Sequence, residues 1–148
     1  MKPTIVILLT LCIAGCSSTS QQTGDAKKVK ETLKNSREAA IRQQHNLGVL
    51  YSNGIGMSLD CENSVKWFHK AAEQGLLESQ INLGIAYQVQ VGRGVATDII
   101  NAYIWFTIAS VNGSKLAGKS RDNIGQYMSR VQIQKAQRTV SEMLENNP

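Results

Sequence analysis

The sequence lacks the residue patterns on which common enzyme classes depend. No serine is followed three residues later by lysine, and Lys-Thr-Gly is absent, so an acyl-enzyme of the penicillin-binding type has no nucleophile pair. The chain has two histidines, His45 and His69, and no cysteine or carboxylate lies at metal-ligand spacing around both of them. The Gly-x-Gly turns have neither the third glycine nor the preceding strand of a dinucleotide site. We therefore predict no catalytic residues, no cofactor and no metal, and do not expect an enzyme.

A hydrophobic run of membrane-spanning length is also lacking. The apolar stretch from Ile5 to Ala14 is about ten residues, half of what an unkinked transmembrane helix needs. The cation Lys2 precedes it and the small residue Gly15 follows it. This layout is typical of a secretory signal peptide, which we assign to residues 1–15. A transmembrane anchor is the alternative.

The end of that run, Ile13-Ala14-Gly15-Cys16, resembles the bacterial lipobox. The resemblance implies cleavage before Cys16, attachment of diacylglycerol to its thiol and acylation of its amine. Several acyl chains anchor a protein stably, whereas one chain does so only marginally. Ser17 is not the aspartate that retains enterobacterial lipoproteins in the inner membrane, so the resemblance implies the outer membrane. An ordinary signal peptide cut elsewhere is the alternative.

Cysteine is scarce, with three in the whole chain. If Cys12 leaves with the signal peptide and Cys16 carries lipid, Cys61 remains as a lone thiol without an intramolecular partner. The fold must then be stable without disulfides. We expect Cys61 to be a small, half-buried residue near the start of a helix. An exposed thiol capable of intermolecular pairing is the alternative.

The residues after the lipobox predict a tether and then a helix. Residues 17–26 contain no apolar residue larger than alanine, so we interpret residues 16–26 as a lipidated cysteine and a flexible tether. Between Lys27 and Arg42, Val29 and Leu33 lie at near-helical spacing. They predict a short helix that packs on the helices after Arg42. We place the helical domain at residues 27–148.

The centre of the chain is present twice. The segment from Gln43 to Gly75 matches Ser79 to Gly113 at thirteen of 33 positions, with an offset of 36 residues that becomes 38 where the second copy has two extra residues. A repeat of this length signals stacked helix pairs. The principal recurring residues are Leu47, Gly48, Tyr51, Gly54, Gly56, Asp60, Trp67 and Gly75, then Leu83, Gly84, Tyr87, Gly92, Gly94, Asp98, Trp105 and Gly113.

The recurring residues have local roles in a helical hairpin. Gly48 and Gly84 lie inside the first helices, where glycine costs about 1 kcal/mol relative to alanine, which indicates that a neighbouring helix passes close by. The Gly-x-Gly turns break those helices, and the aspartates cap the second helices. The recurrence of Trp67 and Trp105 favours packing between repeats over an aromatic binding strip.

The order Asn-Leu-Gly, Tyr, Gly-x-Gly, Asp, Trp, Ala, Gly resembles the Sel-one-like repeat, a relative of the tetratricopeptide repeat. The resemblance implies an all-α fold, a short right-handed α-solenoid of stacked helix hairpins with repeats at about 37–75 and 76–113. Gln43, Ser64 and Ser79 depart from the alanines usual at the family's helix contacts. Some cysteine-rich members of the family are linked to β-lactams, but their paired cysteines are absent here.

The C-terminal part resembles the helix pair that closes such arrays, at about residues 114–145. The resemblance is carried by Arg121-Asp122, Met128-Ser129, Gln132-Ile133 and Ala136-Gln137. The spacing Ser129-x-x-Gln132 predicts a capping box. The apolar positions of the last helix are expected at Val131, Ile133, Ala136, Val140, Met143 and Leu144.

Positive charge gathers near the C-terminus. Loss of Lys2 with the signal peptide lowers the formal net charge from +5 to +4, and residues 43–114 carry −2 whereas residues 115–138 carry +5. A basic end can meet anionic lipid, lipopolysaccharide or an acidic protein. Nucleic acid is not an expected partner of an exported protein. We predict a partner-binding role for Lys119, Arg130 and Lys135; a solvated basic face without a partner is the alternative.

Together these patterns predict a lipoprotein anchored to the bacterial outer membrane and facing the periplasm. Its expected role is that of a protein–protein interaction module or scaffold in the cell envelope. A surface-exposed factor that binds a host or foreign protein is the alternative, and an enzyme acting on β-lactams or peptidoglycan is a third hypothesis. The sequence does not identify the protein partner.

The lipobox gives a direct prediction. Cys16→Ser removes the thiol that receives diacylglycerol, so metabolic lipid labelling should be lost and the protein should be released or left unprocessed. Labelling and membrane fractionation after a high-salt wash measure this. If the variant stays with the membranes after that wash, the lipid anchor is wrong.

Overall fold

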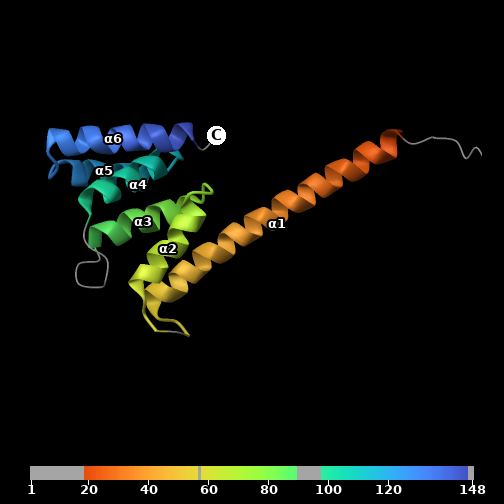
Figure 1. Cartoon of the computed structure of the whole chain (residues 1–148), viewed down its shortest axis with the longest axis horizontal. Helices are drawn as coiled ribbons and strands as arrows, with labels where there is room; N and C mark the ends of the chain where they lie inside the picture. The colour runs from red at the N-terminus through yellow and green to blue at the C-terminus, as the bar shows by residue number, and fades with distance from the viewer. Residues whose placement is uncertain (1–18, 57, 90–97, 147–148) are drawn as a thin grey trace, which may run out of the picture. The chain divides into compact units, whose positions relative to one another are not determined.

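The computed structural model describes residues 19–56, 58–89 and 98–146, with side chains from residue 26 onward. These residues form helices and no strand, in the order α1 (Thr19–Asn53), α2 (Cys61–Ala72), α3 (Leu77–Val89), α4 (Ile99–Val111), α5 (Lys115–Gly125) and α6 (Arg130–Glu145) (Figure 1). The all-α helical solenoid predicted from the repeat is confirmed. None of these helices combines the length and apolar character that crossing a membrane demands.

The chain divides into two compact units, residues 1–35 and 36–148. In the first unit, α1 begins at Thr19, inside the segment predicted to be a flexible tether, so that prediction is wrong from Thr19 onward. Low hydrophobicity prevents these residues from forming a core, but Gln, Ala and Lys are good helix formers. Val29 and Leu33, expected to pack on the repeats, are 58% and 65% exposed. Cys16 lies outside the described residues.

The second unit, residues 36–148, begins with a hairpin made by the end of α1 and the whole of α2. A second hairpin follows, made by α3 and α4. Asp60 and Asp98 cap α2 and α4, each accepting a hydrogen bond from the backbone N–H three residues later, as predicted. Their own N–H groups donate to the carbonyls of Tyr51 and Tyr87, both at 3.0 Å. This backbone hydrogen bond from aspartate to tyrosine thus joins the two helices of each hairpin.

Each hairpin closes where a phenylalanine ring lies on a glycine. A Cβ atom added to Gly48 would lie 2.6 Å from the Phe68 ring, and one added to Gly84 would lie 2.6 Å from the Phe106 ring. Both phenylalanines are buried. The close helix approach predicted at the two glycines is confirmed. Gly92 and Gly94 lie outside the described residues, as do the two extra residues of the second copy.

Two serines at helix contacts, Ser64 and Ser79, are fully buried. The Ser64 hydroxyl donates to the carbonyl of Gly48 at 2.9 Å, within the first hairpin. The Ser79 hydroxyl and His45 Nδ1 share a hydrogen bond of 2.8 Å between the first and second hairpins. The serines therefore satisfy buried polar groups where alanine would only pack.

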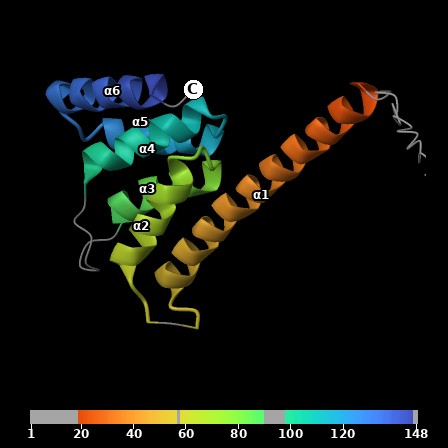
Figure 2. The same ribbon diagram turned by 45° about the vertical axis from the view of Figure 1, so that its right-hand side comes forward.

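Helix α4 is the centre of the core. It packs against α3, α5 and α6, while α3 also packs against α2 (Figure 2). Seven of its residues are buried, so it shows no polar face over most of its length. The buried residues are Ala102, Tyr103, Ile104, Trp105, Phe106, Ile108 and Ala109.

The closing pair α5 and α6 comes after the second hairpin, and the capping box of Ser129 and Gln132 is present. Ala136 and Val140 are buried, with Ile133 and Met143 packed beside them. The buried stripe therefore has steps of three and four residues. Of the apolar positions expected on this helix, Val131 and Leu144 are exposed and do not belong to the core.

Glycine at the hairpin contact can be tested at Gly84. Gly84→Ala places a methyl group against the buried Phe106 ring, which cannot swing away, so we expect a loss of about 1–3 kcal/mol in the free energy of unfolding. Gly125→Ala is the matched control, because its Cβ would meet only an ordinary 3.4 Å contact with Tyr103. Urea denaturation measures both. Equal stabilities of the two variants would refute the close-packing role.

Candidate interaction surface

The two repeats carry equivalent pairs of side-chain amides. Gln74 Nε2 donates to Gln44 Oε1 at 2.7 Å, and Asn112 Nδ2 donates to Gln80 Oε1 at 2.9 Å. In both pairs the acceptor lies on the first helix of a repeat and the donor lies just after the second. The amides therefore fasten each hairpin near the C-terminal end of its second helix.

Gln80 is the most constrained of these amides. It is 2% exposed, and its Nε2 donates to the carbonyl of Ala72 while its Oε1 accepts from Asn112. Both ends of its side chain are thus satisfied inside the protein. The bond to Ala72 also ties the second repeat to the end of α2.

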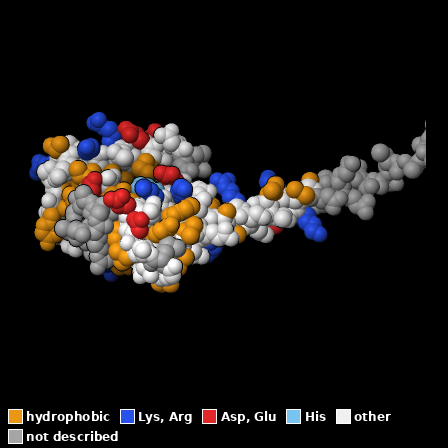
Figure 3. All heavy atoms as spheres, turned by 60° about the horizontal axis from the view of Figure 1, so that its bottom comes forward, with side chains coloured by type: hydrophobic (Ala, Val, Ile, Leu, Met, Phe, Trp, Pro, Cys, Tyr) orange, Lys and Arg blue, Asp and Glu red, His pale blue; other side chains and the backbone are white. Residues whose placement is uncertain are grey.

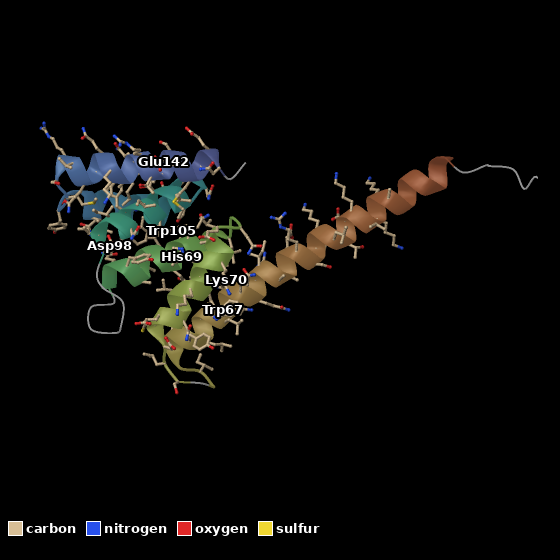
Figure 4. The ribbon with its side chains drawn as sticks, in the orientation of Figure 1. Trp67, His69, Lys70, Asp98, Trp105 and Glu142 are labelled. Carbon is tan, nitrogen blue, oxygen red and sulfur yellow. The ribbon has the colours of Figure 1, made fainter. Side chains whose placement is uncertain are left out.

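A groove of about 680 Å³ lies beside these amides. Trp105 and Ile108 of α4 form part of its wall, and Glu142 stands on α6 (Figure 4). We call it the helix-end groove, because α2, α4 and α6 all end at it. Its lining comprises Ala72, Glu73, Gln74, Gly75, Gln80, Trp105, Ile108, Asn112, Glu142, Met143, Leu144 and Asn146.

The helix-end groove is negative in character. Each helix C-terminus carries partial negative charge from its last carbonyls, and three such ends meet here. Glu73 and Glu142 add carboxylates, and no lysine or arginine is among the described lining residues. A cationic group would therefore be stabilised in the groove.

The two tryptophans occupy equivalent helical positions but different surroundings. Trp105 is 3% exposed, and the ring of His69 meets it edge-on with 5.2 Å between centroids. Trp67 is only half-buried, with the ammonium of Lys70 4.0 Å from its ring centroid. Equivalent placement in the repeat is confirmed, whereas equivalent burial is not, because His69 of the first repeat covers Trp105 while Trp67 is met by Lys70 of its own helix.

His69 joins the two repeats. Its Nε2 shares a 2.8 Å hydrogen bond with the Tyr87 hydroxyl, and its Nδ1 lies 3.8 Å from a Glu73 oxygen. Burial lowers the pKa of His69, and the negative charge of Glu73 opposes this only in part. Burial likewise raises the pKa of Tyr87. Within the described residues, no three His, Cys, Asp or Glu side chains are grouped to hold a metal.

The remaining predicted residues lie apart from the groove. Lys119, Arg130 and Lys135 are exposed on α5 and α6 and do not line the helix-end groove. Basic side chains lie at the upper left of the face drawn in Figure 3.

Cys61, expected to be half-buried near a helix start, begins α2 and is 3% exposed. Arg121 forms an ion pair of 2.6 Å with Asp122, so a structural role for Arg121 is consistent with the geometry.

Sequence reasoning missed the amide pairs, although Gln44 and Gln80 are visible as a recurring pair. The signal for their partners is weaker, since Gln74 recurs as Asn112 and not as an identical residue. The binding face expected from a solenoid is the one lined by the helices of Asn46 and Asn82. The helix-end groove is lined mainly by α2, α4 and α6 instead, with Gln80 as its contribution from α3.

The Sel1 repeat family profile matches residues 44–76 and 77–114, one match on each hairpin. Residues 44–76 and 77–114 are two Sel1 repeats. The family resemblance drawn from the sequence is confirmed. Repeats of this family are protein-interaction modules, and their fold is a scaffold that is not typically catalytic.

Relatives and solved structures agree with this assignment. A Sel1-like repeat-containing protein of Acanthamoeba polyphaga mimivirus is 37% identical over 59 residues, which is 40% of this chain and 10% of that protein. A protective antigen present in uropathogenic Escherichia coli strains, which displays an SLR fold, superimposes with a TM-score of 0.64 at 33% identity. That match covers 70% of this chain and 22% of the antigen.

A Sel1 repeat protein from Oxalobacter formigenes matches with a TM-score of 0.52 at 27% identity, covering 68% of this chain and 42% of that one. This chain thus spans less than half the length of each of these three proteins. The shared part is the helical repeat, and the comparison supports the fold.

The buried histidine predicts a pH dependence of stability. Because the folded-state pKa of His69 lies below its ordinary value of about 6.5, the unfolded chain binds the proton more readily. The stabilisation is complete above the unfolded pKa and is lost as the pH falls through the folded pKa. His69→Gln should lessen the drop in unfolding free energy between pH 7.5 and pH 5 in urea titrations. His45, whose pKa is also lowered by burial, accounts for part of the remaining drop. An unchanged drop in the variant would contradict the assignment.

Proposed function

We propose that the protein is an outer-membrane-anchored lipoprotein that acts as a protein-interaction module or scaffold in the bacterial cell envelope. The observation that carries the interaction role is the pair of stacked Sel1 repeats with an open groove beside them. The solenoid presents this groove on well-packed helices, so a partner meets a surface that is already formed.

The envelope location is supported by the sequence of residues 13–16, which resembles a lipobox. Lipid on Cys16 would hold the folded repeats beside a membrane through residues 17–35. The most fitting arrangement has the domain on the periplasmic side of the outer membrane, where envelope machines could be recruited. No catalytic step is part of this proposal.

The basic closing helices supply a second means of recognition. Lys119, Arg130 and Lys135 are exposed and form no ion pair within the described residues. Exposed charge of this kind governs the encounter rate and selectivity more than affinity. An acidic patch on the partner, or the anionic membrane surface beside it, is the complementary surface for these three side chains.

A surface-exposed factor is a second candidate, and one comparison favours it. The structural neighbour from uropathogenic Escherichia coli is described as a protective antigen. By analogy, this chain would face outward and bind a host or foreign protein. Protease treatment of intact cells separates the two orientations, because only an outward-facing domain is cleaved without permeabilisation.

The interaction role is tested by capture from crosslinked envelopes with the lipid anchor intact. Reversal of Lys119, Arg130 and Lys135 to glutamate should slow association with the captured partner and flatten its salt dependence. A helical circular dichroism spectrum equal to that of the wild type is the control for folding. If association kinetics do not change, the basic side chains are only solvated. If the wild type captures no specific protein, the interaction role itself fails.

A further inference from the structure

The free polar groups of the helix-end groove are hydrogen-bond acceptors. Gln74 uses its Nε2 group on Gln44 and on the carbonyl of Lys70, which leaves its Oε1 as the unused atom of the amide. Asn112 donates a hydrogen bond from its Nδ2 group to Gln80, so the Oδ1 atom of Asn112 takes no part in that bond. No donor to either oxygen is found in the described part of the chain. A ligand that fits must bring N–H groups.

Glu142 adds a carboxylate to these acceptors. It lies in the last turn of α6, is exposed and lines the groove. No salt bridge to it is found among the described residues. Glu73 also lines the groove, with His69 beside it. An ionised carboxylate only accepts hydrogen bonds, so Glu142 makes the same demand on a ligand as the amides do.

The walls between these acceptors are apolar. Trp105, Ile108 and Met143 line the groove beneath the polar groups. The methylene stem of a long cationic side chain can lie along such a wall while its charged end meets the acceptors. Among side chains, lysine and arginine combine an apolar stem with donors and no acceptor, and arginine presents five N–H groups in a planar fork.

We propose that the helix-end groove binds an arginine-bearing extended segment of the partner protein. The negative ends of α2, α4 and α6 provide the field that attracts the guanidinium group. Glu142 and the carbonyl oxygens of Gln74 and Asn112 accept its N–H groups. This inference rests on the proposed interaction role and names the chemistry of the partner segment. In this arrangement the partner's cationic segment binds the groove, and an acidic surface of the partner meets Lys119, Arg130 and Lys135.

The binding assay uses the full chain with Trp67→Phe, which leaves Trp105 as the only tryptophan and places the fluorescent reporter at the groove. The probe is a blocked Gly-Arg-Gly-Arg-Gly peptide, compared with the same peptide in which citrulline replaces arginine. Citrulline keeps the shape and loses the charge. We expect saturable binding of the arginine peptide and roughly tenfold weaker binding of the citrulline peptide.

Glu142→Lys is the test variant in the same background. Its exposed position in the last turn of α6 tolerates a cation, and thermal unfolding followed by circular dichroism checks the fold. Affinity for the arginine peptide should fall roughly tenfold or more. Glu62 is exposed on α2 and lies outside the groove, so Glu62→Lys makes the same change of net charge and should alter affinity less than about twofold.

Three results would overturn the inference: no saturable binding up to about 1 mM, equal affinity for the two peptides, or equal affinity in Glu142→Lys and Glu62→Lys. Capture from crosslinked envelopes separates this failure from failure of the proposed function. A partner still captured by Glu142→Lys but lost on reversal of the basic closing helices leaves the interaction role intact and refutes the groove assignment alone.

Discussion

The contact of a phenylalanine ring with a helical glycine is the constraint on which the rest of the structure depends. At Gly48 and Gly84 the absence of a Cβ lets the second helix of each hairpin lie directly on the first. Any larger residue would push the helices apart, and the buried rings of Phe68 and Phe106 leave no room to relax. The second helices held by this approach are followed by Gln74 and Asn112, whose amides reach back to the first helices.

The groove results from the same repetition. Because the second helices of successive hairpins are equivalent, the ends of α2 and α4 lie on one side of the array, and α6 ends there as well. The carboxylates of Glu73 and Glu142 line the groove with these helix ends, and no lysine or arginine is among its described lining residues. The closing helices carry the opposite sign at Lys119, Arg130 and Lys135. A chain of low overall charge density therefore presents two surfaces with different electrostatic preferences, which favours a partner of mixed charge over a uniformly charged one.

Much of the fold could be predicted because the repeat encodes it locally. Caps at Asp60, Asp98 and Ser129 and the close approach at Gly48 and Gly84 each depend on one residue and its immediate neighbours. The helix from Thr19 could not be predicted from hydrophobicity, because helix propensity does not need a core. Burial on α6 was only partly predictable, since apolar character alone cannot separate Val140 from Val131. The groove could not be predicted, because it is formed by three helix ends that are far apart in the sequence.

The two tryptophans have unequal surroundings. Trp105 is covered by His69 of the first repeat, whereas Trp67 is met by Lys70 of its own helix. The same asymmetry holds for Ser79, whose hydroxyl is satisfied by His45 across the joint. The contact between the two repeats therefore uses polar residues at positions where the two copies of the repeat differ. These two repeats meet at one interface, and His45 and His69 contribute to their stacking there. A longer array would distribute this contribution over several interfaces. Both histidines are held neutral by burial, which lowers the pKa of each. Protonation of either histidine on acidification therefore weakens the contact between the two repeats.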